Sequence, residues 1–250
     1  MKGEARPEAA RRESRARLAN LLLAGVGRAG TTSLFWYLSQ HPDICASERK
    51  EPRYFLPLSE ADEGVSGILP PLEEYERCFE QCSTERYRME ATPGYFHGGP
   101  RLIQGIRTTL EKPRIVIMLR DPVARIWSIY RYAKSHLLLP GNVTFGTYIQ
   151  ECLEVERRRR QRPIEGQAYW SIRASQYAGY IEPWFDAFGD DLRVLFFEDL
   201  IDSPREIVEQ VCDWLGIDRT PVASFDLSVE NRSIRYRSRF LQRVALAANS

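Results

Sequence analysis

The chain has 250 residues, of which 43% are hydrophobic and 28% are charged, and its formal net charge is +1. These values fit one globular domain with a core of its own, and they argue against a nucleic-acid partner, which a strongly basic chain would indicate. No apolar stretch approaches the roughly 20 residues of a membrane-spanning helix, so we expect no membrane partner. The oligomeric state stays open.

The N-terminus and the cysteines suggest where the protein works. Residues 1–17 are rich in Arg, Glu and Ala and predict a flexible arm without a signal peptide, whereas residues 18–250 are predicted to form a single domain. With no anchor segment, we expect a cytoplasmic location. The five cysteines lack zinc-type pairing, so reduced thiols and no metal are expected; they are Cys45, Cys78, Cys82, Cys152 and Cys212.

Strands and helices alternate from the start of the predicted domain. The short apolar run Ala19–Val26 predicts a buried strand, and Thr31–Gln40 predicts a helix that ends at His41-Pro42, where the histidine resembles a cap. Residues 56–75, rich in Pro, Gly and acidic residues, predict a surface loop. A short strand is expected at residues 86–90.

The second half continues this alternation. Two further buried strands are predicted at Arg114–Leu119 and Leu192–Phe197. Helices are predicted over Val123–Ser135, Thr144–Arg162, Ala168–Phe188 and Pro204–Leu215, the last with Ser203 as N-cap, a capping-box acid at Glu206 and a stop at Gly216. The alternation predicts an α/β fold with a mainly parallel sheet flanked by helices.

The first motif joins the first predicted strand to its helix. Gly25–Thr32 matches the phosphate-loop pattern GxxxxGK[ST], except that Thr31 stands in the lysine position. Backbone amides and the helix N-terminus would bind an anion there, but the missing lysine argues against a nucleoside triphosphate. A turn without function is the alternative interpretation. The anion-binding candidates are Gly27, Arg28, Ala29, Gly30, Thr31, Thr32 and Ser33.

The second motif follows the strand Arg114–Leu119. Arg120 lies at its carboxyl end, where open α/β sheets bind ligands, and Ser128 lies eight residues further, about two helical turns on. Together they could bind a second phosphate. The alternative is that Arg120 merely pairs with Asp121 or with a helix C-terminus.

Taken together, the motifs resemble those of the sulfotransferases that use 3′-phosphoadenosine-5′-phosphosulfate (PAPS). GVGRAGTTSLFWYLSQHPDI is similar to the 5′-phosphosulfate loop of that family, and IVIMLRDPVARIWSIY to its 3′-phosphate motif. The similarity continues through VLFFEDLIDSPREIVEQVCDWLGI and NRS, and covers about Leu21 to Arg239. KEPRYF and MEATPGYF resemble the heparan sulfate glucosaminyl sulfotransferases and their bacterial relatives.

The resemblance implies a P-loop-like three-layer fold and an activity. A sulfuryl group would pass from PAPS to a hydroxyl or amine of a carbohydrate or small natural product, leaving 3′-phosphoadenosine 5′-phosphate (PAP), without a metal. By position, Glu51 falls on the general base of the family and Arg28 on its catalytic lysine. Arg120 and Ser128 fall on the ligands of the 3′-phosphate, and residues 31–33 on the 5′-phosphate loop.

Several alternatives stay open at this point. Glu90, His97 and His41 are the rival bases, and Glu90, His97 and Trp170 are candidates for contact with the acceptor. The other tryptophans lie on apolar periodic segments and are expected to be mostly core. The charged run Arg157–Arg162 predicts a solvated helix face.

The sequence departs from the family pattern at three points. They are the arginine at position 28, Ala91 in place of a frequent lysine, and an end at Ser250 soon after NRS. These departures keep an inactive PAP-binding domain as one rival, and a P-loop kinase for a nucleotide or a small molecule is the other.

Overall fold

The computed structural model describes residues 18–61, 66–158 and 169–228. They fall into two compact units. The first combines the described residues up to Leu119 with Ala178–Ser228, and the second is Arg120–Tyr177 without the undescribed stretch. The predicted arm 1–17 and the NRS segment lie outside the described residues, and the single domain over 18–250 stays a prediction.

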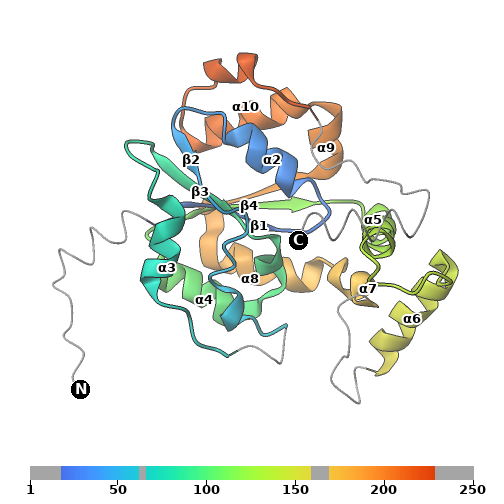
Figure 1. Cartoon of the computed structure of the whole chain (residues 1–250). Helices are drawn as coiled ribbons and strands as arrows, with labels where there is room; N and C mark the ends of the chain where they lie inside the picture. The colour runs from blue at the N-terminus through green and yellow to red at the C-terminus, as the bar shows by residue number, and fades with distance from the viewer. Residues whose placement is uncertain (1–17, 62–65, 159–168, 229–250) are drawn as a thin grey trace, which may run out of the picture. The chain divides into compact units, whose positions relative to one another are not determined.

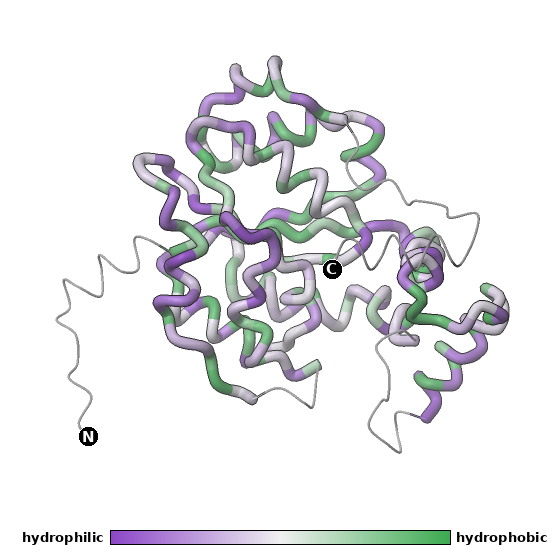
Figure 2. The backbone as a smooth tube through the Cα atoms, in the orientation of Figure 1, coloured by the Kyte–Doolittle hydropathy of each residue, from purple (hydrophilic) through white to green (hydrophobic). Residues whose placement is uncertain are grey.

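A five-stranded sheet of order β2-β3-β1-β4-β5, with every pair parallel, forms the centre of the first unit. Its strands are β1 (Leu21–Gly25), β2 (Ile44–Ala46), β3 (Tyr87–Ala91), β4 (Arg114–Leu119) and β5 (Leu192–Phe196). All of β1 is buried, and in β4 only the first residue is partly exposed. Because helices cover both faces of the sheet, β1 and residues 115–119 of β4 are continuous apolar runs, green in Figure 2.

Helices cover both faces of this sheet (Figure 1). On one face lie α2 (Thr31–Leu38), α9 (Phe197–Asp202) and α10 (Pro204–Leu215), and on the other α3 (Leu72–Glu76), α4 (Gly99–Thr109) and α8 (Ala178–Phe188). Short 3-10 turns connect them: η1 (Leu56–Leu58), η2 (Arg77–Phe79), η3 (Pro93–His97), η5 (Gly189–Asp191) and η6 (Thr220–Ser224). The predicted three-layer α/β fold is thereby confirmed.

The second unit is helical, with α5 (Pro122–Ser135), α6 (Phe145–Arg158) and α7 (Ser171–Ala174). Its core gathers Ala133, Leu139, Tyr148 and Cys152. On α6, Arg157 and Arg158 are exposed and pair with Glu154, as expected of a solvated helix face; residues 159–162 of that charged run lie outside the described residues. Within the described ranges, no helix combines the length and apolar character needed to cross a membrane.

Several elements differ from the prediction. The helix expected over Ala168–Phe188 is interrupted after α7, where the Ala174 carbonyl accepts a hydrogen bond from the buried Arg125 side chain. Residues 56–75 contain η1 and most of α3 rather than loop alone, and neither β2 nor α4 was predicted. Ser203 is the N-cap of α10 but makes no side-chain cap bond, whereas Gly216 ends the helix at φ 68° as predicted. Trp36 and Trp127 are 47% and 42% exposed and are not core.

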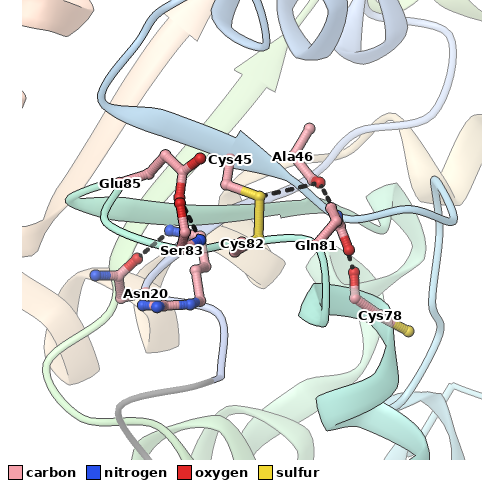
Figure 3. Close-up of a disulfide and its surroundings, with 9 residues drawn as sticks. Asn20, Cys45, Ala46, Cys78, Gln81, Cys82, Ser83 and Glu85 are labelled. Atoms are coloured by element: carbon pink, nitrogen blue, oxygen red, sulfur yellow. Dashed lines mark hydrogen bonds between the residues drawn. A yellow bond between two sulfur atoms is a disulfide. The ribbon is translucent and has the colours of Figure 1, made fainter.

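A disulfide corrects the expectation of reduced thiols. Cys45 in β2 is bonded to Cys82, with 5.7 Å between their Cα atoms (Figure 3). Beside it, the Gln81 side-chain amide donates to the Ala46 carbonyl at 2.7 Å. These contacts fasten β2 to the turn that precedes β3. Cys78, Cys152 and Cys212 are free.

Candidate functional site

The predicted site residues of the first unit gather at one edge of its sheet. In a parallel sheet all carboxyl ends meet at the same edge, and ligands bind there where the strand order reverses. β1 lies between β3 and β4, so its carboxyl end is such a point. The ends of β2, β3 and β1 lead into the acidic segment (residues 50–55), into η3, and into the phosphate loop (residues 26–30).

The phosphate loop turns sharply into α2. Arg28 and Gly30 have φ of 70° and 80°, the left-handed region, and Gly30 is the N-cap of α2 without any side-chain cap. Uncapped amides at a helix N-terminus, together with the helix dipole, favour an anion. Thr31 and Ser33 are buried, while Arg28 and Thr32 are half-buried. The loop therefore has the features of a monoanion or phosphate ester site.

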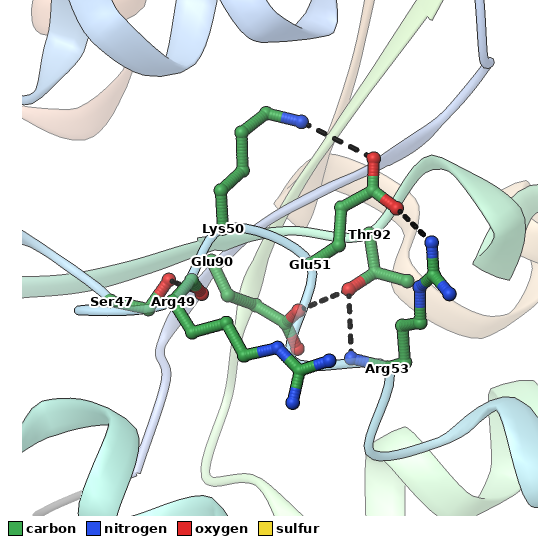
Figure 4. A network of polar contacts seen from close by, with 7 residues as sticks. All are labelled: Ser47, Arg49, Lys50, Glu51, Arg53, Glu90 and Thr92. Atoms are coloured by element: carbon green, nitrogen blue, oxygen red, sulfur yellow. Dashed lines mark hydrogen bonds and ion pairs between the residues drawn. The ribbon is translucent and has the colours of Figure 1, made fainter. Parts of the chain in front are cut away.

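The acidic segment carries Glu51 on an unusual backbone. Glu51 and Arg53 have φ of 61° and 62°, which non-glycine residues seldom adopt. The Glu51 carboxylate lies 3.4 Å from Lys50 Nζ and 3.1 Å from Arg53 Nη2, and its side chain is 34% exposed (Figure 4). Glu51 thus forms two ion pairs, yet its side chain stays partly accessible.

The second candidate carboxylate, Glu90, is enclosed. It is 0% exposed, and its oxygens accept hydrogen bonds from the hydroxyls of Tyr75 (2.6 Å), Thr92 (2.7 Å) and Tyr95 (3.1 Å). Burial raises the pKa of Glu90 to about 7, although the three hydroxyls work in the opposite direction. A carboxylate so enclosed offers no surface to an acceptor, so contact with the acceptor is not supported by its position.

The two candidate histidines lie at opposite edges of the sheet. His97 ends η3 and is half-buried, its ring edge-on to Phe96 and Tyr180 with centroids 5.0 and 4.9 Å away. It therefore lies at the carboxyl edge beside the phosphate loop, because Phe96 packs on Gly25. His41 lies between α2 and β2, at the opposite edge.

Both ring nitrogens of His41 have structural partners. Nε2 lies 2.6 Å from the Asp218 carbonyl, and Nδ1 accepts from the Asp43 amide at 3.0 Å. The ring is almost fully buried, at 2% exposure. The C-cap of α2 is Ser39, so the ring does not cap that helix as the sequence suggested. His41 instead links the turn at Asp43 to Asp218, and it has no place among the bases.

The second anion motif belongs to the second unit. Arg120 is the first residue after β4, and its carbonyl accepts a hydrogen bond from Tyr177 at 2.9 Å. Asp121 caps α5, since its Oδ1 accepts from the Ala124 amide at 2.7 Å. Ser128 lies half-buried on α5. The motif thus begins at the capped N-terminus of α5. Tyr177 holds the backbone at Arg120, directly before that helix.

Sequence reasoning missed the residues that hold this motif. Arg125 is 4% exposed, and its Nη1 donates to the Ala174 carbonyl and to Ser175 Oγ, both at 2.9 Å. Its guanidinium also lies over the ring of Tyr177, 5.9 Å from the ring centroid. The arginine at the end of RDPVAR was the one signal in the sequence, but its burial follows only from the fold. Trp170 is the half-buried N-cap residue of α7, so it stays a candidate.

Comparisons with known proteins agree with this picture. The fold is that of a P-loop-like α/β protein. A family model described as the sulfotransferase domain matches residues 18–240, so the chain belongs to the sulfotransferase family. The match runs through both compact units.

Two curated relatives are also named as sulfotransferases. Heparan sulfate glucosamine 3-O-sulfotransferase 6 of Mus musculus is 28% identical over 213 residues, covering 82% of this chain and 54% of that protein. The membrane-associated sulfotransferase kil1 of Dictyostelium discoideum is 34% identical over 119 residues, 46% of this chain and 23% of that protein. The chain therefore spans about half, or less, of these curated relatives.

A solved structure extends the likeness to the fold. The crystal structure of a sulfotransferase from Alicyclobacillus acidocaldarius is 28% identical, with a TM-score of 0.71 over 92% of this chain and 90% of that one. The predicted family is confirmed by these findings. Among the described residues, no three His, Cys, Asp or Glu side chains gather as metal ligands would.

Proposed function

We propose that this protein is a PAPS-dependent sulfotransferase that sulfates a hydroxyl or amine of a carbohydrate or small natural product. The observation that carries the proposal is that the uncapped N-terminus of α2 and an accessible carboxylate, Glu51, follow strands that end at the same edge of the sheet. Membership of the sulfotransferase family supports it. PAPS enters as the sulfuryl donor and leaves as PAP.

Each site residue has a proposed role in this reaction. Glu51 takes the proton of the acceptor while the acceptor oxygen or nitrogen forms its bond to sulfur. The bond between sulfur and the 5′-phosphate oxygen breaks, and the electron pair departs with the phosphate. Arg28 and the amides of the phosphate loop stabilise that charge; the guanidinium stays protonated and therefore supplies no proton.

The 3′-phosphate has its own proposed ligands, Arg120 and Ser128. His97 and Trp170 are proposed to contact the acceptor, His97 because it ends η3 at the edge where Glu51 lies. The cytoplasmic location stays a prediction, and the Cys45–Cys82 disulfide is more typical of oxidising compartments.

Calorimetry with three ligands tests the donor. PAP should bind with micromolar affinity, about −8 kcal/mol, more tightly than AMP and than ATP with magnesium. Tighter binding of ATP would favour the kinase alternative. PAP binding without turnover of PAPS, across sugar and small-molecule acceptors, would favour the inactive binding domain.

Replacing Arg120 tests the second motif. Arg120→Ala should weaken PAP by about 1.5–3 kcal/mol and leave AMP unchanged, because the lost contact is a charge-assisted hydrogen bond to the 3′-phosphate. Ser128→Ala should cost about 1 kcal/mol. Equal losses for PAP and AMP in Arg120→Ala would mean that the arginine holds the fold rather than the 3′-phosphate.

A further inference from the structure

One buried carboxylate holds the backbone of the acidic segment through two hydroxyls. The Arg53 amide donates to Thr92 Oγ1 at 3.3 Å, and that hydroxyl donates to Glu90 Oε2 at 2.7 Å. The Phe55 amide donates to the Tyr95 hydroxyl at 3.3 Å, and that hydroxyl donates to Glu90 Oε1 at 3.1 Å. Each hydroxyl has one proton, so accepting from an amide commits that proton to Glu90. We call these two chains of hydrogen bonds the Glu90 relay; Figure 4 shows the branch through Thr92.

The held backbone is the strained part of the segment. Glu51 and Arg53 both lie in the left-handed region, and such residues persist only where the surroundings fix them. The relay holds the amide of Arg53 itself and the amide two residues further on. Its loss would free the turn that presents Glu51.

Aromatic packing supports the relay but does not replace it. Tyr54 stacks on Tyr75 with ring centroids 4.6 Å apart, and Phe55 lies edge-on to Tyr75 and Tyr95 at 5.6 and 5.7 Å. These contacts fix the rings that follow the turn. They leave the direction of the turn to the hydrogen bonds, which are strengthened by complete burial of Glu90.

We infer that Glu90 is a positioning residue for Glu51, acting through Thr92 and Tyr95 on the backbone of the acidic segment. The inference rests on the proposed function, in which Glu51 removes the acceptor proton. It gives the enclosed carboxylate a role that requires no contact with the acceptor. In this arrangement the buried Glu90 supports the backbone of the segment, and the accessible Glu51 is the base.

Two variants cut the relay at its hydroxyls. Thr92→Val and Tyr95→Phe keep the shape of the side chain and remove one link each, so kcat should fall about ten- to a hundredfold, the effect of a misplacement near 1 Å. KM for PAPS and the affinity for PAP should stay unchanged, because the phosphate loop is untouched. Thr92→Ser keeps the hydroxyl and should restore kcat.

The matched control is Tyr75→Phe. Tyr75 donates to the same Glu90 oxygen as Tyr95, yet it bonds no amide of the acidic segment among the contacts of the described residues. This variant should lower the melting temperature and leave kcat within about twofold. Equal loss of kcat in Tyr75→Phe and Tyr95→Phe would overturn the inference, since it would indicate a general structural effect.

Amide hydrogen exchange tests the relay without any reaction. The amides of Arg53 and Phe55 should exchange faster in Thr92→Val and Tyr95→Phe respectively, and at the wild-type rate in Tyr75→Phe. Unchanged exchange in both relay variants would overturn the inference even if sulfuryl transfer is observed. If wild type transfers no sulfuryl group while the exchange pattern holds, the proposed function fails and the support of the segment stands.

Discussion

At the scale of single residues, two carboxylates a short way apart in the fold have different surroundings. Glu51 is 34% exposed and paired with two cations, whereas Glu90 is 0% exposed and surrounded by hydroxyls. Only an accessible carboxylate can reach an acceptor proton, which must approach within hydrogen-bond distance. Exposure therefore assigns the base to Glu51 in our proposal, and burial assigns the supporting role to Glu90.

Glu51→Gln is the direct test of the base. The amide keeps the shape but cannot take a proton, so single-turnover transfer at saturating PAPS should slow by about 10²–10⁴-fold. Affinity for PAP should stay nearly intact. Glu48→Gln, an exposed acid of the same stretch, removes the same charge and serves as the control. Near-normal transfer by Glu51→Gln, with a collapse only in His97→Ala, would move the base to His97.

At the scale of elements, the loop between β1 and α2 contains two glycines with different roles. The fold requires Gly30, whereas Gly27 leaves room for a ligand. Gly30 has φ 80°, and a Cβ there would lie 2.8 Å from the Phe197 ring. A Cβ on Gly27 would meet no atom of the described residues within 4 Å. The two positions therefore predict different consequences of the same substitution.

Gly30→Ala should lower the free energy of unfolding by about 1–3 kcal/mol, because alanine is strained in the left-handed region. Gly27→Ala should unfold like wild type but bind PAP about tenfold more weakly, since the added methyl would block the approach of a phosphate to the loop. Chemical denaturation and calorimetry measure the two effects. Normal PAP affinity in Gly27→Ala would show that the anion does not approach this side of the loop.

The short strand β2 depends on the disulfide more than its length suggests. β2 has three residues and leads directly into the acidic segment, and Cys45–Cys82 closes a loop with a sequence separation of 37. Removing such a crosslink is expected to cost about 3–4 kcal/mol by the chain-entropy estimate. Cys45→Ser should show this loss in denaturant under oxidising conditions, and reductant should bring wild type to the same midpoint. Five titratable thiols in unfolded, unreduced protein would contradict the bond.

At the scale of the whole molecule, the buried Glu90 couples stability to pH. Burial raises its pKa from 4.5 to about 7 in the folded protein, so the fold binds a proton that the unfolded chain releases. Its contribution is complete below pH 4.5 and is lost as the pH rises through about 7. Tyr75 and Tyr95, with pKa values raised by burial, stay neutral in this range, and the Glu51 charge adds to the shift. The thiol of Cys78, whose pKa is also raised, stays protonated as well.

Comparison with Glu90→Gln isolates this effect, because glutamine does not titrate. The stability of wild type relative to the variant should fall by about 3 kcal/mol between pH 4.5 and 7, at about 1.4 kcal/mol per pH unit. Urea unfolding at a series of pH values measures the difference. Parallel curves for the two proteins would mean that the carboxyl group titrates normally.

Features encoded by short stretches could be predicted from the sequence alone. The apolar runs gave β1 and β4 within two residues at each end, Pro122 and Gly216 marked a helix start and a helix end, and the pattern Gly25–Thr32 located the phosphate loop. These signals depend on side-chain period, on proline and on glycine conformation, all of which act over a few neighbouring residues.

Which polar groups are buried, and what they contact, became known only from the three-dimensional structure. Cys45 meets Cys82 across 37 positions, and Arg125 reaches Ala174 and Ser175 in a segment 49 and 50 residues away. Glu90 looked like a second base in the sequence, yet it is enclosed by hydroxyls that strand order and η3 bring around it. A polar group is stable in the interior only when distant parts of the chain supply its partners, so its role follows from the fold and not from its neighbours in sequence.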